Sequence, residues 1–323
     1  MKTQTFWSII VLASAGVFLS LATIGAAAPA APSSTSAAGT WNPPRLPDGQ
    51  PDVQGRWNAP DEGGKVNGDH NYNVEYGGED AHSKLQGRNI YHSSIVVDPA
   101  DGKIPYQPWA RARQQDIYLN HQDPRSITDI DPEGRCYPSG VTRMSYGPGG
   151  FTMVQFPGMI VMHKEYLHVF RIIYVDSRPH IASNIKLWMG DSRGHWEDTT
   201  LVVDVTNQFH GTWFDVVGNF HSDDAHSVER FHFLDTKTMK YEVTIDDPKV
   251  YTRPWTMSVM MARGGMNPGN PQAGNQDEVW EDSCHEGNKF LDLALQGKPA
   301  AGVTAPRDML TRGKTESRGR SAK

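Results

Sequence analysis

The stretch that decides the fold spans residues 188–255 and opens with WMGDSRGHWE at 188–197. Its later segments are TLVVDV at 200–205, SVERF at 227–231, TIDDP at 244–248 and YTRPW at 251–255. Short runs of β-forming residues alternate here with Gly, Asp and Pro, the residues that favour turns. Ionisable side chains stand inside the runs. The pattern therefore predicts a β fold that carries polar groups on its strands.

Alternation of apolar and polar residues predicts more strands before and after this stretch. The predicted strands are 151–156, 159–175, 201–205, 228–234, 239–245 and 256–261, with turns at Pro157-Gly158 and at 235–238. Short strands joined by hairpin links favour closure into a barrel, because closure removes unpaired edges. We therefore predict a mainly β fold, an antiparallel, lipocalin-like β-barrel with room for one small ligand.

The remaining segments predict an extended N-terminal arm and one or two short helices. Residues 106–119 are the best helix candidate, and 279–295 predict a strand or a short helix. Residues 129–148 are predicted to be rich in loops, and 190–194 to form an Asx-type turn. The predicted domains are a signal peptide at 1–28, a linker and extended arm at 29–100, a single barrel domain at 101–300 and a disordered tail at 301–323.

The N-terminus has the features of an export signal. Lys2 precedes an apolar run at 6–24, and Ala26-Ala27-Ala28 offers small residues for cleavage. An uncleaved anchor is the alternative, because about 19 apolar residues can just span a bilayer. The short charged flank and the Ala-rich exit favour cleavage. We therefore expect a periplasmic or extracellular protein with no stable membrane insertion after the leader is removed.

Composition limits the partners. The chain of 323 residues has a net charge of −6 spread along its length, so no basic face for nucleic acid is implied. No nucleotide fingerprint is visible, and no cofactor is expected. The 13 His residues include no H-E-x-x-H motif, and no paired-Cys spacing occurs, so no metal site is expected. The expected partner is a small-molecule ligand or substrate, and the oligomeric state stays open.

The chain has two cysteines, Cys136 and Cys284. In an oxidising compartment they can form one disulfide that closes a loop of about 150 residues. Two unpaired, buried thiols are the alternative. We expect the disulfide, because the leader directs the chain to an oxidising compartment.

Glu229 is the carboxylate singled out by its neighbours. It alternates with Phe231 and Phe233 and therefore shares their apolar face. Desolvation raises the pKa of a carboxyl in such a place, which suits a general acid or base near neutral pH. The alternative is a brace, in which Glu229 pairs with Arg171 or Arg253.

Other ionisable and aromatic residues complete the candidate site. Glu165 and Arg171 share one face of the predicted strand 159–175, and His168 lies on the opposite face. The catalytic candidates are Glu229, Glu165, His168 and His221, and the substrate-binding candidates are Arg171, Arg230, Trp213 and Tyr251. A histidine would exchange the proton and an arginine would stabilise developing negative charge. Rim salt bridges and aromatic core packing are the alternatives for the same residues.

A set of motifs resembles a family of secreted bacterial proteins that are usually described only as hypothetical proteins. The motifs are DPE at 131–133, RCYP at 135–138, MGDS at 189–192, WE at 196–197, LVVD at 201–204, ER at 229–230 and TIDDP at 244–248. The resemblance covers residues 49–288 and implies no catalytic residue, because no chemistry is assigned to the family. Where that family usually has Gly after WE, this chain has Asp198-Thr199. From Trp196 onward the strand pattern is also similar to small lipocalin-like barrels.

Three functions fit these observations. The first is a cofactor-independent acid–base enzyme, a lyase, isomerase or hydrolase, acting on a small and largely apolar molecule in an enclosed polar-lined pocket. The second is a non-catalytic binding protein of lipocalin type, and the third is a surface interaction protein. Converging carboxylate and His groups favour the enzyme, whereas an apolar cavity with a single polar group favours the binder.

Overall fold

The structure is a computed structural model that describes residues 41–59, 73–75, 94–147, 149–264 and 283–296. The predicted signal peptide at 1–28 and the predicted tail at 301–323 lie outside the described residues.

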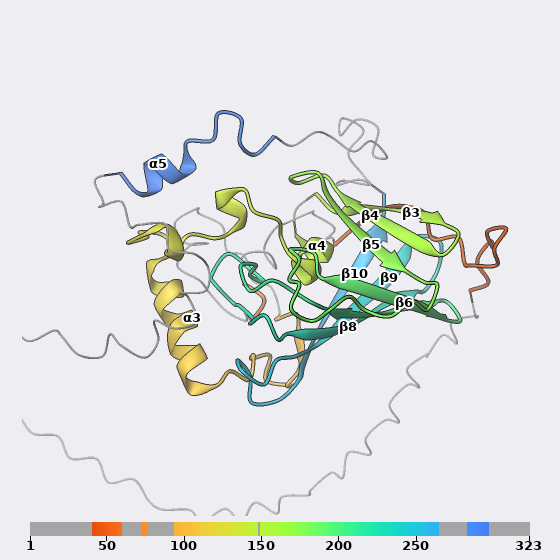
Figure 1. Cartoon of the computed structure of the whole chain (residues 1–323), viewed down its shortest axis with the longest axis horizontal. Helices are drawn as coiled ribbons and strands as arrows, with labels where there is room; N and C mark the ends of the chain where they lie inside the picture. The colour runs from red at the N-terminus through yellow and green to blue at the C-terminus, as the bar shows by residue number, and fades with distance from the viewer. Residues whose placement is uncertain (1–40, 60–72, 76–93, 148, 265–282, 297–323) are drawn as a thin grey trace, which may run out of the picture. The chain divides into compact units, whose positions relative to one another are not determined.

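The described strands form one closed barrel (Figure 1). Their order is β1 (Gly55–Asn58), β3 (Phe151–Phe156), β4 (Met159–Lys164), β5 (Val169–Tyr174), β6 (Asp191–Glu197), β7 (Thr200–Thr206), β8 (His226–Phe233), β9 (Thr238–Asp246), β10 (Trp255–Arg263) and β2 (Val96–Asp98). Closure occurs because β1 pairs with both β3 and β10, while β2 pairs only with β10. The prediction of a mainly β barrel is confirmed.

One pair of neighbouring strands departs from the antiparallel pattern. β5 and β6 run parallel and meet only at Ile173–Ser192 and Tyr174–Arg193. Parallel neighbours cannot be joined by a tight hairpin, and residues 175–190 make the connection without a helix or a strand. We call this place the seam, because residues 169–172 of β5 have no register partner on β6.

The inner side of the barrel is filled. Alternate residues of the strands face inward and form a core that includes Trp57, Phe151, Phe231 and Tyr241. The short helix α4 (Val141–Tyr146) packs into the same core, and all six of its residues are buried. Figure 1 shows α4 among the strands.

Helix α3 (Pro108–Asn120) confirms the predicted helix, and it lies beside the strands (Figure 1). Its Ile117 packs on Gly218, whose positive φ of 84° suits glycine and where an added Cβ would lie 2.4 Å from the Ile117 side chain. The shorter helical elements are η1 (Ile127–Asp129), η2 (Glu133–Arg135) and α5 (Phe290–Ala294).

Several predicted elements differ from the structure. The predicted strand 159–175 is a hairpin, since Leu167 and His168 take positive φ and turn the chain between β4 and β5. Residues 191–194 of the predicted turn at 190–194 belong to strand β6, and the predicted loop at 129–148 contains η2 and α4. The segment expected to be an arm contributes β1 and β2, which are too short to show an alternating pattern.

The predicted disulfide is confirmed. Cys136 and Cys284 are bonded, with their Cα atoms 5.7 Å apart, so the C-terminal segment with α5 is linked to the residue that follows η2. A disulfide fits an oxidising compartment. Within the described ranges, no helix has the length and apolar character needed to cross a membrane.

Cys284→Ser should destabilise the protein, because the link joins residues separated by 148 positions. In the chain-entropy model, loss of a disulfide that closes a loop of this length lowers the free energy of unfolding by about 5 kcal/mol. Urea denaturation of oxidised wild type and variant measures the difference. Cys136→Ser should give the same loss. A Cys284→Ser variant as stable as oxidised wild type would contradict the structural role of the link.

Candidate functional site

The predicted acid or base Glu229 lies inside the barrel in a closed set of contacts. Arg171 Nη1 donates to Glu229 Oε1 at 3.0 Å, and Arg171 Nη2 pairs with Glu229 Oε2. Tyr241 OH donates to Glu229 Oε1 at 2.7 Å, and Arg171 Nε donates to Ser192 Oγ at 3.0 Å. Glu229, Arg171 and Tyr241 are all buried. The guanidinium and the carboxylate thus hold each other through two contacts, and each also has a hydrogen-bond partner outside the pair. This geometry fits the brace.

The placement of Glu229 on the face of Phe231 and Phe233 agrees with the structure, since all three side chains are buried. Its partner is Arg171, whereas Arg253, the other predicted partner, pairs with Asp98 on the surface. Glu165 does not share a face with Arg171, because it lies in the turn after β4 and pairs with Arg56 at 2.6 Å.

The other predicted site residues lie apart from this pair. His168 is exposed in the β4–β5 turn, beside a hollow of about 380 Å³ next to the disulfide. Arg230 lies on the outer face of the barrel and pairs with Glu197 at 2.8 Å. Trp213 and Tyr251 are buried core residues, and Tyr251 OH donates to the carbonyl of Phe220.

His221 is buried with both ring nitrogens in contact. Nδ1 lies 2.8 Å from the carbonyl of Ser222, and Nε2 lies 2.8 Å from Thr212 Oγ1. A neutral ring that donates from Nδ1 and accepts at Nε2 fits both contacts. Burial lowers the pKa of His221 and favours this neutral form. The four predicted catalytic residues are therefore not brought into one site.

A second polar cluster surrounds α4 and was missed by sequence reasoning. Arg143 holds Asp131 through two hydrogen bonds of 2.7 and 2.8 Å and also pairs with Glu133 at 2.8 Å. Lys164 is fully buried beside this cluster and donates to the carbonyl of Met144 at 3.4 Å. Burial lowers the pKa of Lys164 to about 8, although Glu133 opposes the shift. Alternation from Ile160 and Met162 is the signal that could have placed Lys164 inside.

Hydroxyl groups beside this cluster line a narrow space. Ser139, Thr142, Thr212 and His221 are among its lining residues, and the space does not admit a water molecule. Among the described residues, Ser139 Oγ and Thr142 Oγ1 are buried without a hydrogen-bond partner. The space is thus polar but closed.

Another accessible hollow lies at the seam, and we call it the seam groove. Its volume is about 710 Å³. The lining residues are Phe170, Arg171, Ile172, Tyr174, Arg178, Pro179, Ile181, Leu187, Met189, Asp191 and Arg193. Arg171, which lies between the outward-facing Phe170 and Ile172, is also a lining residue, and its buried guanidinium forms the pair with Glu229. The groove lies where β5 lacks a partner on β6.

The walls of the seam groove are mostly apolar. Phe170 and Ile172 point outward from β5 and are 60% and 41% exposed. The guanidinium of Arg178 stacks on the ring of Tyr174 at 3.8 Å and pairs with Asp176 through Nε and Nη2. Its Nη1 makes no hydrogen bond within the described part of the chain, which leaves a cationic donor at an apolar groove.

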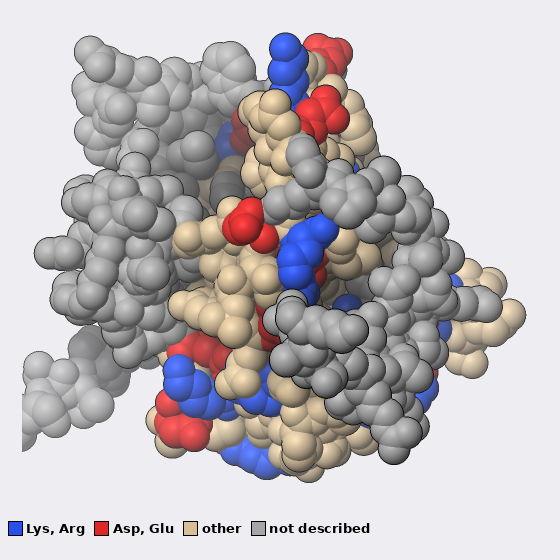
Figure 2. All heavy atoms as spheres, turned by 90° about the vertical axis from the view of Figure 1, so that its left-hand side faces the viewer, with Lys and Arg blue, Asp and Glu red and all other residues tan. Residues whose placement is uncertain are grey.

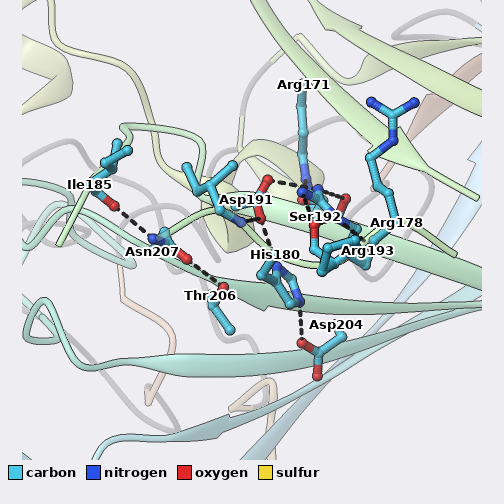
Figure 3. Close-up of polar contacts among 12 residues, drawn as sticks. Arg171, Arg178, His180, Ile185, Asp191, Ser192, Arg193, Asp204, Thr206 and Asn207 are labelled. Carbon is cyan, nitrogen blue, oxygen red and sulfur yellow. Dashed lines mark hydrogen bonds and ion pairs between the residues drawn. The ribbon is translucent and has the colours of Figure 1, made fainter. Parts of the chain in front are cut away.

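Polar side chains fasten one wall of the groove to the barrel (Figure 3). His180 contacts Asp191 Oδ2 at 2.7 Å and Asp204 Oδ1 at 2.8 Å, and Arg193 Nη1 contacts Asp191 Oδ1 at 2.7 Å. Burial alone would raise the pKa of Asp191, but hydrogen bonds from the Ile181 amide, His180 and Arg193 hold it below its usual range. These residues were not predicted as part of a site, because residues 190–194 were expected to form a turn and not the start of a strand.

Charged groups elsewhere give no further site. No group of three or more His, Cys, Asp and Glu side chains in the described ranges is arranged to hold a metal ion. On the face that Figure 2 shows, Lys and Arg lie among Asp and Glu instead of gathering into a patch of one sign.

Fold and site together define a disulfide-linked β-barrel protein with an apolar groove at a parallel seam. Comparisons with protein-family models, curated proteins and solved structures give no match. The resemblance to secreted bacterial hypothetical proteins stays a prediction.

Glu229→Gln tests the brace. The substitution keeps the shape of the side chain but leaves the guanidinium of Arg171 buried without a counter-charge, so the free energy of unfolding should fall by about 3 kcal/mol. Chemical denaturation measures the change. Glu197→Gln is the matched control, because its pair with Arg230 also joins two strands but lies on the exposed face, and we expect no measurable loss there. Equal effects in the two variants would contradict the brace.

Lys164→Met tests the buried ammonium. Between about pH 8 and the ordinary lysine pKa of 10.5, the unfolded chain keeps a proton that folded Lys164 has lost, so this group makes stability rise with pH. Below that window the charged form destabilises the fold, by about 3 kcal/mol at most. The variant should therefore be more stable than wild type at pH 7, with a difference that shrinks toward pH 10.5. Denaturation across this range measures it.

Lys240→Met is the control for this measurement, because Lys240 is partly exposed on the outer face of β9 and pairs with Glu242. The difference in the free energy of unfolding between this variant and wild type should not change with pH. A Lys164→Met variant that is less stable than wild type at pH 7 would show that the ammonium stabilises the core.

Proposed function

We propose that the protein is an exported, non-catalytic binding protein of the periplasm or the extracellular space. Its ligand is a small and largely apolar molecule with one anionic group, and it lies in the seam groove. Sites of this kind have apolar walls and a few polar groups that fix the orientation of the ligand.

The observation that carries the proposal is the lining of the groove. Phe170, Ile172 and Leu187 provide apolar surface that is exposed to solvent. Arg178 provides a guanidinium that is 48% exposed at the same groove. A guanidinium forms charge-assisted hydrogen bonds with carboxylate, sulfonate or phosphate oxygens. An apolar molecule with an anionic end therefore matches both features.

The outer face next to the groove extends its apolar surface. The register of β3, β4 and β5 places Val154, Val161 and Ile172 in one outward row and Phe156, Met159 and Tyr174 in the next. No Asp, Glu, Lys or Arg faces outward on these three strands, whereas the outer face of β9 carries Lys240 and Glu242. Exposed apolar patches of this kind mark interaction sites. The patch favours a ligand with more apolar surface than the groove alone covers.

The state of the acid and base candidates favours binding over catalysis. Glu229 and His221 are held by partners inside the barrel, and Glu165 is paired with Arg56. A general acid or base needs to reach the proton that it transfers. None of these three side chains lines the seam groove.

An acid–base enzyme is the second candidate, and the buried cluster beside α4 favours it. Burial raises the pKa of Asp215 to about 7, against the hydrogen bond from Asn219, whereas burial lowers the pKa of His221. Groups with a pKa near neutral pH suit proton transfer. Ser139 and Thr142 hydroxyls without partners lie beside His221 in the described part.

Native mass spectrometry of the mature protein purified from the exported fraction separates the two candidates. A binder retains an apolar anion that is recovered unchanged after incubation. Conversion of the retained molecule into a product of different mass would support the enzyme and contradict the binder.

Ile172→Asp should abolish binding of the fluorescent probe 1-anilino-8-naphthalenesulfonate, because a carboxylate would stand in the apolar wall and repel the sulfonate. Met260→Asp is the matched control. Met260 is 48% exposed on β10 and does not line the groove, while Ile172 is 41% exposed. Fluorescence titration measures both affinities, and circular dichroism checks that both variants fold. Equal affinities for the two variants would show that the probe binds elsewhere.

Arg178→Gln should weaken the sulfonate probe about fivefold, the effect of one partly exposed charge-assisted hydrogen bond. The neutral probe N-phenyl-1-naphthylamine, which lacks the sulfonate, should bind wild type and variant equally. An equal loss for both probes would mean that Arg178 shapes the groove and does not recognise the anion.

A further inference from the structure

One wall of the seam groove has no regular secondary structure. Residues 178–182 belong to the connection between β5 and β6, and Arg178, Pro179 and Ile181 line the groove. In the described residues, every hydrogen bond between the main chain of this wall and the barrel involves a side chain. These side chains are Asp191, Arg193 and Asn207. The position of the wall therefore depends on individual polar contacts and not on a backbone ladder.

His180 stands in the middle of this wall and joins it to two strands (Figure 3). Nδ1 lies 2.7 Å from Asp191 Oδ2 on β6, and Nε2 lies 2.8 Å from Asp204 Oδ1 on β7. An ionised carboxylate only accepts hydrogen bonds, so both contacts are hydrogen bonds only when both ring nitrogens carry a proton. A neutral ring keeps one of these two hydrogen bonds, and its unprotonated nitrogen directs a lone pair at the other carboxylate.

Charged groups from each neighbouring element surround His180. Arg193 Nη1 lies 2.7 Å from Asp191 Oδ1 on the same strand, and His226 Nε2 of β8 lies 2.7 Å from Asp204 Oδ2. Arg178 belongs to the wall itself and pairs with Asp176. Arginines keep their charge at all physiological pH values, and His226 is not part of the wall. A change in the charge of His180 therefore alters how the wall is attached to β6 and β7.

We propose that His180 is a positioning residue of the seam groove and makes ligand binding depend on pH. The imidazolium holds the wall against β6 and β7. Loss of the proton from one ring nitrogen removes one of the two attachments and loosens the wall. The inference rests on the proposed function, since it concerns the groove in which the ligand lies.

The affinity for 1-anilino-8-naphthalenesulfonate tests this role, because the sulfonate stays ionised throughout. Wild-type affinity should fall about fivefold between about pH 5.5 and about pH 8.5, the effect of one partly exposed charge-assisted hydrogen bond. The affinity of His180→Gln should be nearly independent of pH, and this variant also corrects for the general effect of net charge. Wild-type affinity that does not change with pH would overturn the proposal, as would a folded His180→Gln variant with the pH dependence of wild type.

His195→Gln is the matched control. His195 lies on β6, is 64% exposed and contacts Glu197 at 3.2 Å, so it is another strand histidine beside a carboxylate, but it does not line the groove. This variant should keep the pH dependence of wild type. A flat profile in His195→Gln would assign the effect to surface charge in general and overturn the role of His180.

Hydrogen–deuterium exchange gives a readout that needs no ligand. The Ile181 amide donates to Asp191 Oδ2 at 3.0 Å, so its protection reports how firmly the wall is held. After correction for intrinsic rates, protection should fall with rising pH in wild type and be low at both pH values in His180→Gln. The amide of Val203 in β7 should not respond.

The two readouts separate the two proposals. If Ile172→Asp leaves sulfonate binding intact, the proposed function fails and amide exchange alone decides the role of His180. The other result is that Ile172→Asp abolishes binding while protection of the Ile181 amide changes neither with pH nor in His180→Gln. That result would contradict the role of His180 and support the proposed function.

Discussion

The buried ion pair between Arg171 and Glu229 spans a part of the barrel where neighbouring strands share few residue pairs. β5 and β6 share only two residue pairs, whereas β8 and β9 share eight. Arg171 connects β5 to Glu229 on β8 and to Ser192 on β6. Removing two charges from water is unfavourable unless geometry and hydrogen bonding compensate. The bidentate contact and the hydroxyl of Tyr241 supply that compensation, so the pair can link β5, β6 and β8 from inside the barrel.

The same seam gives the molecule its accessible groove. A parallel pair of strands needs a long connection, and residues 175–190 supply one that lies against the outside of β5. Because residues 178–182 of this connection form no backbone ladder with the barrel, side chains of β6 and β7 hold this part in place. A local defect in strand pairing thus creates both a hollow and a wall whose position depends on charged groups.

Side chains fill the interior of the barrel, although closure into a barrel suggested an interior with room for a ligand. A barrel of this size can hold a small ligand, but α4 and aromatic side chains occupy the described interior. Around α4, Arg143 pairs with Asp131 and Glu133, and Lys164 donates to the carbonyl of Met144. Because the interior is filled, the proposed ligand site lies on the outer surface, where the apolar rows of β3, β4 and β5 meet the groove.

The sequence by itself determined the features that depend on local periodicity or on a single possible pairing. Strands β3 and β7 to β10 follow from alternation, because each strand shows its two faces within a few residues. The same alternation placed Glu229 on the inner face with Phe231 and Phe233. The two cysteines allow one intramolecular pairing, and that disulfide forms.

Only the tertiary structure decided which strands are neighbours and what lies between them. β1 and β2 have four and three residues, too few for a period to appear, and β6 carries Gly, Asp and Arg in a pattern that is typical of a turn. The partner of Glu229 is 58 residues away, and His180 joins two strands that follow it by 11 and 24 residues. Such contacts depend on the order and register of strands across the closed barrel. Local sequence carries no record of that order, because each strand can form its ladder with any neighbour that the connections allow.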